Sequence, residues 1–367
     1  MSFFVPPLIT YAELSLELPA HESLWRARSP QEWRQNFLDR TKSGIRPLPK
    51  VAHCLHDAHS FLEASDQIDV PFSRHIALSM FWRQIWDCRQ LSASTKSADD
   101  AHHSTSLSLA SSHWQHDLLQ ALQHFRMTIT EVDPLSPPAA VVYEHLLLNI
   151  FVSFEELSRF AGKEGMREAR RAFPVLKQWV RSRESRQAVW YAAQILRQAR
   201  TFTTGTLRNF SAIVLYHAGL TLWAYGLLAD VPNKRDHKSR LQQSSTIDDQ
   251  GRAQGSANEN EDVAVLDGDD TAQVQRFIAL NRGTPALRYC RASSQAELST
   301  LMSNRTMSNE YAFLDSPKDV LKVVVAILQG NQGAGSGKGA APLVENLTRL
   351  MQDLSHAASK ISHRPTA

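Results

Sequence analysis

The sequence predicts an all-α protein, a large irregular helical bundle with disordered loops and a disordered linker. Helix start signals recur along the chain, strand signals are scarce, and a long uncharged stretch follows an amphipathic segment. Hydrophobic residues make up 43% and charged residues 21% of the 367 residues, as in ordinary globular proteins. The chain is therefore long enough for one large domain or two ordinary ones.

Helix N-termini are marked by a capping residue followed three positions later by an acid. This pattern occurs in TYAE at residues 10–13, SPQE at residues 29–32 and SPKD at residues 316–319. The cap oxygen accepts a hydrogen bond from a backbone N–H, and the acid favours the positive end of the helix. A proline opens a further helix, expected over residues 138–160. The β-branched run at residues 323–328 is expected to continue the helix that starts at SPKD.

The segment of residues 209–229 carries no formal charge and is long enough to cross a bilayer. Polar residues are spread along it, with His217 near its midpoint, and they raise the cost of membrane insertion. Ser211, Ala218 and Gly219 form a narrow side that a second helix could approach closely. The amphipathic segment just before it is a natural packing partner. We therefore expect a buried core helix rather than a membrane anchor.

The expected domain organisation begins with one helical body over residues 1–231. A loose loop is expected within it at about residues 92–112, where small polar residues dominate. Residues 232–262 have almost no apolar side chains to offset the entropy cost of ordering, so we expect a disordered linker there.

Shorter pieces complete the expected organisation. Residues 263–330 are expected to form a helical segment that packs back onto the body, and residues 331–340 a Gly-rich flexible linker. Residues 341–367 are expected to form a C-terminal helix and tail. Four leucines in it are spaced as one apolar stripe that needs a partner surface. They are Leu343, Leu347, Leu350 and Leu354.

The most basic segment runs from Met166 to Arg186 and contains seven cations but two acids. On a helix, a basic face with Trp179 beside it could contact nucleic acid or an acidic partner. The candidate contact residues are Arg167, Arg170, Arg171, Lys177, Arg181 and Arg183. The alternative is a solvated face that has no binding role, with three apolar side chains turned toward the core. These are Phe173, Leu176 and Val180.

No motif predicts catalysis, a metal site or a cofactor site. The histidines of HCLHDAH at residues 53–59 converge poorly on one helix face. The Gly-rich stretch at residues 330–340 lacks the first glycine and the hydroxyl of a phosphate-binding loop. Cys54, Cys88 and Cys290 are far apart and have no zinc-ligand spacing. We expect no enzymatic activity and no metal or other cofactor in this chain.

Five sequence segments between Phe3 and about Asn331 carry a family resemblance. They read PPLITYAELSLELPA, LWRARSPQEWR, SRQAVWYAAQILRQAR, LRNFSAIVLYHAGLTLWAYGLL and NEYAFLDSPKDVLKVVVAILQGN. Together they resemble the regulatory region of fungal transcription factors, the fungal-specific transcription factor domain found behind zinc fingers with two cysteines and two histidines. The resemblance covers most of the chain and rests on these whole segments, not on a catalytic signature.

The resemblance implies a nuclear, all-α regulatory domain that controls transcription through contacts with the transcription machinery or co-regulator proteins. In the family, DNA is contacted by a separate zinc module near the N-terminus. This sequence has no cysteine pair at zinc-ligand spacing, and its first residues resemble a segment from the middle of the domain. We therefore expect either a truncated protein or a factor that has lost its DNA-binding module, in both cases without a zinc finger of its own. Self-association is expected because apolar faces that the missing part would cover become exposed.

Two other classes of protein remain open. One is a single-pass or peripheral membrane protein anchored through residues 209–229, although we expect no membrane contact. The other is an all-α small-molecule sensor or enzyme with an apolar pocket.

Overall fold

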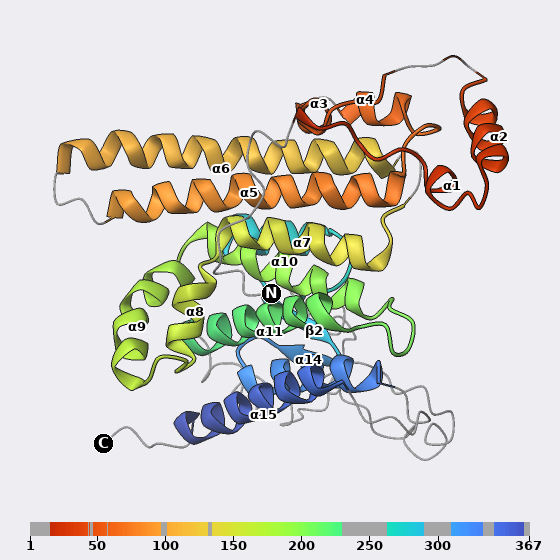
Figure 1. The fold of residues 1–367 in the computed structure, drawn as a ribbon. Coiled ribbons are helices and arrows are strands. Elements are labelled where there is room, and N and C mark those ends of the chain that lie inside the picture. Colours follow the sequence, from red (N-terminus) through yellow and green to blue (C-terminus); the bar gives the residue numbers. More distant parts are fainter. Residues whose placement is uncertain are drawn as a thin grey trace, which may run out of the picture. The chain divides into compact units, whose positions relative to one another are not determined.

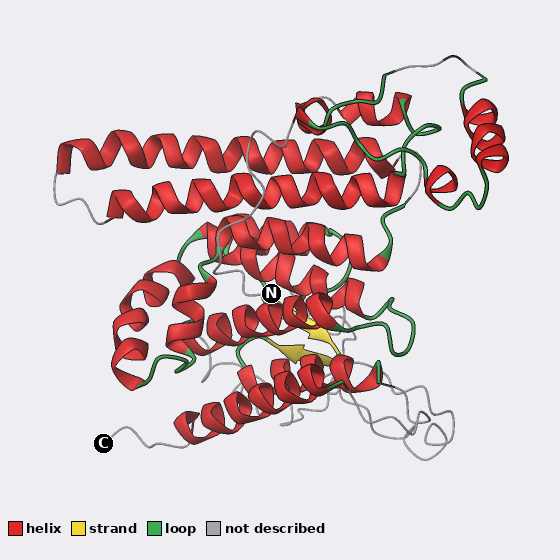
Figure 2. Cartoon of the chain, viewed as in Figure 1, coloured by secondary structure: helices red, strands yellow, loops and turns green. Residues whose placement is uncertain are grey.

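The computed structural model describes residues 15–42, 44, 47–56, 58–96, 101–130, 134–229, 263–289, 310–332 and 341–362 (Figure 1). The protein is mostly α-helical, as the sequence predicts, and its described part includes a small sheet (Figure 2). The chain divides into two compact units, Met1–Ile150 and Phe151–Ala367. The expected single body over residues 1–231 is therefore wrong, because residues on either side of position 150 pack mainly within their own unit.

Unit 1, Met1–Ile150, is built around two long helices that lie side by side along their length (Figure 1). Shorter helices lie at one end of this pair. The helices of the unit are α1 (Glu22–Trp25), α2 (Pro30–Arg40), α3 (Val51–His56), α4 (Ala58–Glu63), α5 (Val70–Lys96), α6 (Ala101–Thr130) and α7 (Pro137–Phe151).

Aromatic packing joins α4, α5 and α6 in the core of unit 1. The Phe125 ring of α6 meets Phe61 of α4 edge-on and lies 5.5 Å from Phe81 of α5, between ring centroids. All three rings are buried, and such pairs stabilise beyond their buried area. An ion pair of 2.7 Å between Arg126 and the buried Glu144 ties α6 to α7.

The expected loose loop at residues 92–112 is wrong. Helix α5 continues to Lys96 and α6 begins at Ala101, so most of this stretch is helical. The stretch contains no glycine and no proline, and small polar residues are weak helix formers rather than breakers. Because adding one residue to an existing helix costs little, both helices extend past their apolar parts.

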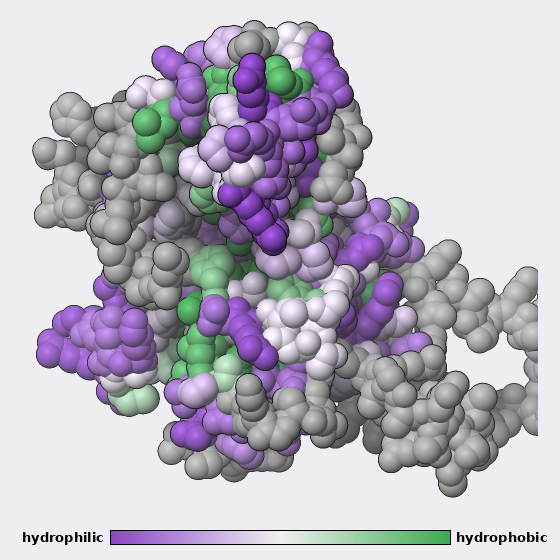
Figure 3. Space-filling view, turned by 45° about the vertical axis from the view of Figure 1, so that its right-hand side comes forward, coloured by the Kyte–Doolittle hydropathy of each residue, from purple (hydrophilic) through white to green (hydrophobic). Residues whose placement is uncertain are grey.

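Helix α2 begins as the sequence predicts but buries none of its residues. The Ser29 hydroxyl accepts from the Glu32 backbone N–H at 3.1 Å, while the Glu32 carboxylate accepts from the Arg28 N–H. Trp25 and Trp33 lie exposed at this end of unit 1. Figure 3 turns this end toward the viewer and shows hydrophobic residues among hydrophilic ones at the surface.

Unit 2, Phe151–Ala367, combines helices with a three-stranded sheet (Figures 1 and 2). Its helices are α8 (Phe154–Phe160), α9 (Met166–Val180), α10 (Arg183–Ala199), α11 (Asn209–Leu228), α13 (Ala272–Leu280), α14 (Pro317–Gly330) and α15 (Pro342–Ser362). Its strands are β1 (Val263–Val265), β2 (Thr284–Arg288) and β3 (Tyr311–Phe313).

Helix α11 is the central helix of unit 2. It packs against α10, as expected for the amphipathic segment before it, and also against α14, α15, α8 and α9. A methyl group added at Gly219 would lie 3.0 Å from Met351 and 3.1 Å from Val324, so the predicted narrow side admits α14 and α15. The helix is long and apolar enough to span a membrane, but 78% of its apolar window is buried inside the protein.

The sheet corrects the expectation that residues 263–330 are helical. Strands β1 and β2 are parallel, and β3 adds to β2 in the antiparallel sense. The parallel pair needs a crossover, which α13 provides. Strands of three to five residues leave too little alternation to predict from sequence. Helix α13 contacts α10 and α14 contacts α11, all within unit 2.

Two further expectations concern helix starts. The helix predicted over residues 138–160 is interrupted at Val152 and Ser153, where the Ser153 hydroxyl caps α8 by accepting from the Glu156 N–H at 3.4 Å. Helix α14 starts at SPKD and includes VVVAIL, as predicted. However, the Ser316 hydroxyl donates to the Asp319 carboxylate at 2.6 Å instead of capping the backbone.

The segments on either side of the expected Gly-rich linker also differ from prediction. Asn331 is buried, and its side-chain oxygen accepts from the Leu207 N–H at 2.8 Å, so it belongs to the folded core and not to a linker. On α15 the buried residues are Val344, Leu347, Thr348 and Met351, while Leu350 of the predicted stripe is exposed. Residues 10–13, 232–262 and 333–340 lie outside the described residues.

Candidate macromolecule-binding face on helix α9

Helix α9 is amphipathic, and its buried side fixes its place in unit 2. Ala172, Leu176 and Val180 recur every four residues and are buried where the helix meets α8, α10 and α11. Phe173 is 47% exposed, and its ring lies 6.4 Å from that of Phe160 on α8, between ring centroids. Phe173 therefore lies at the border of the buried side, and the expectation that it turns into the core is wrong. A rotation of about 100° per residue carries Phe173 from the buried stripe to its edge.

Two hydrogen bonds hold α9 against its neighbours. The indole N–H of Trp179 donates to the Phe151 carbonyl at 2.9 Å. The Lys177 ammonium donates to the Leu228 carbonyl at 3.2 Å, in the last turn of α11. A cation is favourable there because the C-terminal end of a helix is negative. Lys177 therefore stabilises the fold, whereas the sequence placed it among the contact residues.

Four of the predicted contact residues lie on the side of α9 away from its buried stripe, three of them in its first two turns and Arg181 at its C-cap. Arg167, Arg170, Arg171 and Arg181 are all exposed. A rotation of about 100° per residue places them within an arc of about 100°, opposite the buried stripe, and Pro174 and Gln178 lie in the same arc between Arg171 and the C-cap residue Arg181. They span about 21 Å along the helix axis, at about 1.5 Å per residue. We call these four residues the arginine face.

The remaining cations of the segment lie at the start of α10. Arg183 is exposed in the first turn of α10 and so belongs to a different helix from the arginine face. Arg186 is buried, and its guanidinium donates to the Ile278 carbonyl at 2.9 Å and to the Ser182 carbonyl at 2.9 Å. Arg186 therefore joins α10 to α13.

Acids near the arginine face leave it positively charged. Arg171 forms an ion pair of 2.8 Å with Glu168, one turn away on the same helix. Glu164, in the loop before α9, lies 3.4 Å from the Arg159 guanidinium. Arg167, Arg170 and Arg171 thus stand beside one carboxylate, Glu168, in the first half of α9. This excess attracts carboxylates and phosphates, and arginine binds both in bidentate geometry.

Apolar side chains border the arginine face on both sides. Met166 is 70% exposed and Phe173 is 47% exposed, and both lie next to Arg170 around the helix. Val175 is 48% exposed and lies beyond Arg171 on the other side. We call these three residues the apolar rim. The sequence interpretation missed the rim because it assigned Phe173 to the core, although the helical period places Met166 and Phe173 on one side.

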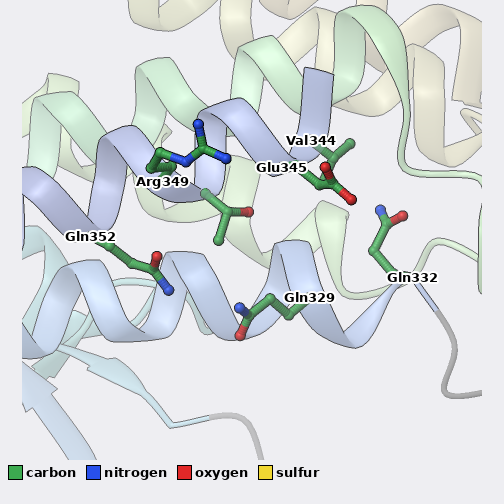
Figure 4. Close-up of a pocket in the computed structure, with 7 residues that line it drawn as sticks. Gln329, Gln332, Val344, Glu345, Arg349 and Gln352 are labelled. Carbon is green, nitrogen blue, oxygen red and sulfur yellow. The ribbon is translucent and has the colours of Figure 1, made fainter. Parts of the chain in front are cut away.

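A second candidate site is a polar groove between α14 and α15, with a volume of about 280 Å³ (Figure 4). It is lined by Gln329, Gln332, Val344, Glu345, Thr348, Arg349 and Gln352. Figure 4 shows amide, carboxylate and guanidinium groups from the two helices around the groove. Such groups suit a small polar molecule. These seven residues include no cysteine, serine or histidine that could form a nucleophile–base pair.

The described residues contain no group of three or more histidine, cysteine, aspartate or glutamate side chains that could hold a metal ion. His53 and His59 of the HCLHDAH segment are exposed, and the side chains at positions 54–58 lie outside the description. The chain matches no protein-family model, no curated protein and no solved structure.

Proposed function

We propose that this chain is the regulatory domain of a fungal transcription factor, which acts in the nucleus by binding the transcription machinery or co-regulator proteins. The arginine face carries the proposal, because it presents four exposed guanidinium groups on a helix whose opposite side is buried. The five sequence segments that resemble fungal transcription factors support the same assignment.

A binding role fits the geometry of the face better than a catalytic role. The arginine face runs for about 21 Å along a helix surface, at about 1.5 Å per residue, and does not enclose a small substrate. Helix surfaces of this length are suited to macromolecular partners. We therefore assign no enzymatic activity to this chain and propose that any DNA contact requires a separate module.

A reporter assay tests the proposal. The full chain is fused to an unrelated DNA-binding domain in a fungal host, and transcription of a reporter with the matching site is measured. We expect the fusion to change reporter output at least threefold, and the triple variant R167E/R170E/R171E to abolish most of that change. Four exposed arginines on one helix are the basis of this expectation.

The matched control reverses three exposed cations of unit 1. The variant R28E/R34E/K42E makes the same change in net charge and is expected to keep the reporter effect. Nuclear amounts of all fusions are compared by immunoblot. A wild-type fusion without effect on the reporter, or equal loss in both variants, would contradict the proposal.

A small-molecule sensor is a second candidate function, and the groove between α14 and α15 favours it. Glu345 and Arg349 offer charges of both signs, and three glutamine amides surround them. Thermal unfolding of the purified chain with a panel of small polar metabolites checks this candidate. A rise in Tm that R349A removes would support a sensor, and no rise across the panel would count against it.

A further inference from the structure

We propose that the arginine face and its apolar rim bind an acidic segment of a partner protein in which large apolar side chains alternate with carboxylates. This inference rests on the proposed function and names the class of partner. The evidence comes from the charge of the face, the placement of the apolar rim and the way the helix is held.

The charge of the face selects an anionic partner. The segment from Met166 to Arg186 has seven cations and two acids, and four of those cations form the exposed arginine face. Guanidinium groups bind carboxylates through two parallel hydrogen bonds and are weakly hydrated, so they are suited to protein interfaces. Arginine is also enriched among the residues that dominate binding energy at interfaces.

The apolar rim distinguishes a peptide from a nucleic acid. Met166 and Phe173 lie on one side of the arginine face and Val175 on the other, and their exposed fractions are 70%, 47% and 48%. A phosphate backbone would pair with the arginines but leave these side chains uncovered. A peptide that carries both carboxylates and apolar side chains could pair with the arginines and also cover the rim.

The same placement argues against an anionic membrane as the ligand. A helix that lies in a membrane surface has one continuous apolar side, with its cations on the opposite side. On α9, the continuous apolar side of Ala172, Leu176 and Val180 is already buried within unit 2. The exposed apolar residues flank the cations on both sides and do not form a second such side.

The helix is held in place before any partner binds. Trp179 donates to the Phe151 carbonyl and Lys177 to the Leu228 carbonyl, so α9 is fastened at its C-terminal half. Because the backbone of a fixed helix is already ordered, only the side chains of its face lose conformational entropy on binding. Its length of about 21 Å matches an extended peptide of about six or seven residues, or a helix of about 14 residues.

The experiment measures fluorescence anisotropy of a labelled 15-residue peptide that alternates Asp or Glu with Phe or Leu. The purified full chain is titrated at 50 and 200 mM NaCl. We expect saturable binding that weakens at the higher salt concentration. We expect R167E/R170E/R171E to weaken binding at least tenfold, and R28E/R34E/K42E to change Kd less than twofold.

Two further titrations test the apolar part of the proposal. We expect F173S to weaken binding about threefold to tenfold with an unchanged salt dependence, because it removes no charge. We expect a peptide of equal charge with serine in place of every Phe and Leu to bind about tenfold more weakly. Equal affinity for the two peptides, together with no effect of F173S, would overturn the assignment of the partner.

Competition separates the peptide from other anionic ligands. A 20-base-pair duplex DNA and vesicles with 30% phosphatidylserine are tested as competitors and as direct ligands. Either one binding the arginine face more tightly than the peptide would overturn the proposal in favour of that ligand. Circular dichroism melts of every variant check that the fold is retained.

The reporter assay and the peptide assay fail in distinguishable ways. If the peptide does not bind but R167E/R170E/R171E still loses the reporter effect, the partner class is wrong and the proposed function stands. If the peptide binds but the reporter does not respond to the arginine variant, binding is real and the proposed function fails.

Discussion

His217 lies near the middle of α11, where its ring stacks on Phe154 at 4.4 Å between ring centroids. Burial and the positive charge of Lys163 lower the pKa of His217 to about 3. The imidazole is therefore neutral in the folded protein at all ordinary pH values. In the unfolded chain the same side chain takes up a proton below a pKa of about 6.5.

This difference predicts acid sensitivity. Below pH 6.5 the unfolded state binds a proton that the folded state does not, so stability falls as the pH drops from 6.5 toward 3. This one group contributes at most about 1.4 kcal/mol per pH unit. In urea unfolding at pH 7, 6 and 5, H217L should show a shallower loss of unfolding free energy than wild type. The exposed-histidine control H53Q should follow wild type, and a slope for H217L equal to that of wild type would refute the prediction.

Gly226 allows the backbone around Leu314 to approach α11 closely. A methyl group added at Gly226 would lie 1.9 Å from the Leu314 carbonyl oxygen, which is much too close for any pair of atoms. A methyl group at Gly330, the last residue of α14, would meet nothing within 4 Å. Close packing therefore requires a glycine at position 226 but not at position 330.

We expect G226A to destabilise the protein by about 3 kcal/mol or more, because the backbone of Leu314 would have to shift. We expect G330A to be neutral or to stabilise by up to about 1 kcal/mol, because alanine lowers the entropy of the unfolded chain. Urea denaturation of both variants provides the measurement. Similar unfolding free energies for G226A and wild type would contradict this role of Gly226.

At the scale of elements, α10 fastens the sheet of unit 2 through a row of polar side chains. Gln194 donates to the Leu266 and Gly268 carbonyls at 2.8 and 3.0 Å. One turn along, Arg197 donates to the Gly268 carbonyl at 2.7 Å. Arg200 follows one turn later and pairs with Asp267 at 2.5 Å. The row holds the loop that follows β1.

Asp267 is the buried end of this network. Its carboxylate also accepts from the Arg288 backbone N–H at 3.0 Å, which connects the loop to β2. D267A should destabilise the protein by about 3 kcal/mol, because it leaves a guanidinium and an N–H without their buried acceptor. D269A removes an 83%-exposed partner of Arg197 and should cost less than about 1 kcal/mol. Equal unfolding free energies for the two variants in urea would contradict this account.

At the scale of the whole molecule, the exposed apolar residues near the start of the described chain bear on association. Trp25 is 75% exposed, and Trp33 stacks on Phe37 at 5.2 Å on a helix that buries none of its residues. Leu16 and Leu38 are exposed nearby in the sequence. Monomeric soluble proteins seldom leave many large apolar side chains together in water.

We predict that these residues promote self-association at high concentration. W25S/W33S should lower the weight-average mass measured by light scattering at several milligrams per millilitre. Its unfolding free energy should fall by no more than about 2 kcal/mol, because only the Trp25 hydrogen bond to the Ala20 carbonyl and the stacking of Trp33 on Phe37 are lost. M127S, which replaces an exposed residue of α6, serves as the control. A wild-type chain that stays monomeric at these concentrations would refute the prediction.

Local signals in the sequence account for much of the fold and for part of the candidate face. Helix hydrogen bonds are local, so each helix signal spans only a short stretch of sequence. The cap at Ser29, the start of α14 at Pro317 and the uncharged run of α11 are such signals. The same helical period places the arginines of α9 on one side. It also places Met166, Phe173 and Val175 beside those arginines, although the sequence interpretation turns Phe173 toward the core.

Only the tertiary structure decided which surfaces meet. Strand β2 pairs with β1, where Val263 faces Thr284, and with β3, where Ala286 faces Phe313. Three- to five-residue strands carry no period long enough to reveal such partners. The hydrogen bond from Lys177 to the Leu228 carbonyl of α11 likewise joins residues that are 51 positions apart. The sequence by itself determined where α2 and α14 begin and which side of α9 is charged, because these depend on neighbours along the chain. The sheet, the two units and the choice of buried side chains depend on distant residues and were decided by packing.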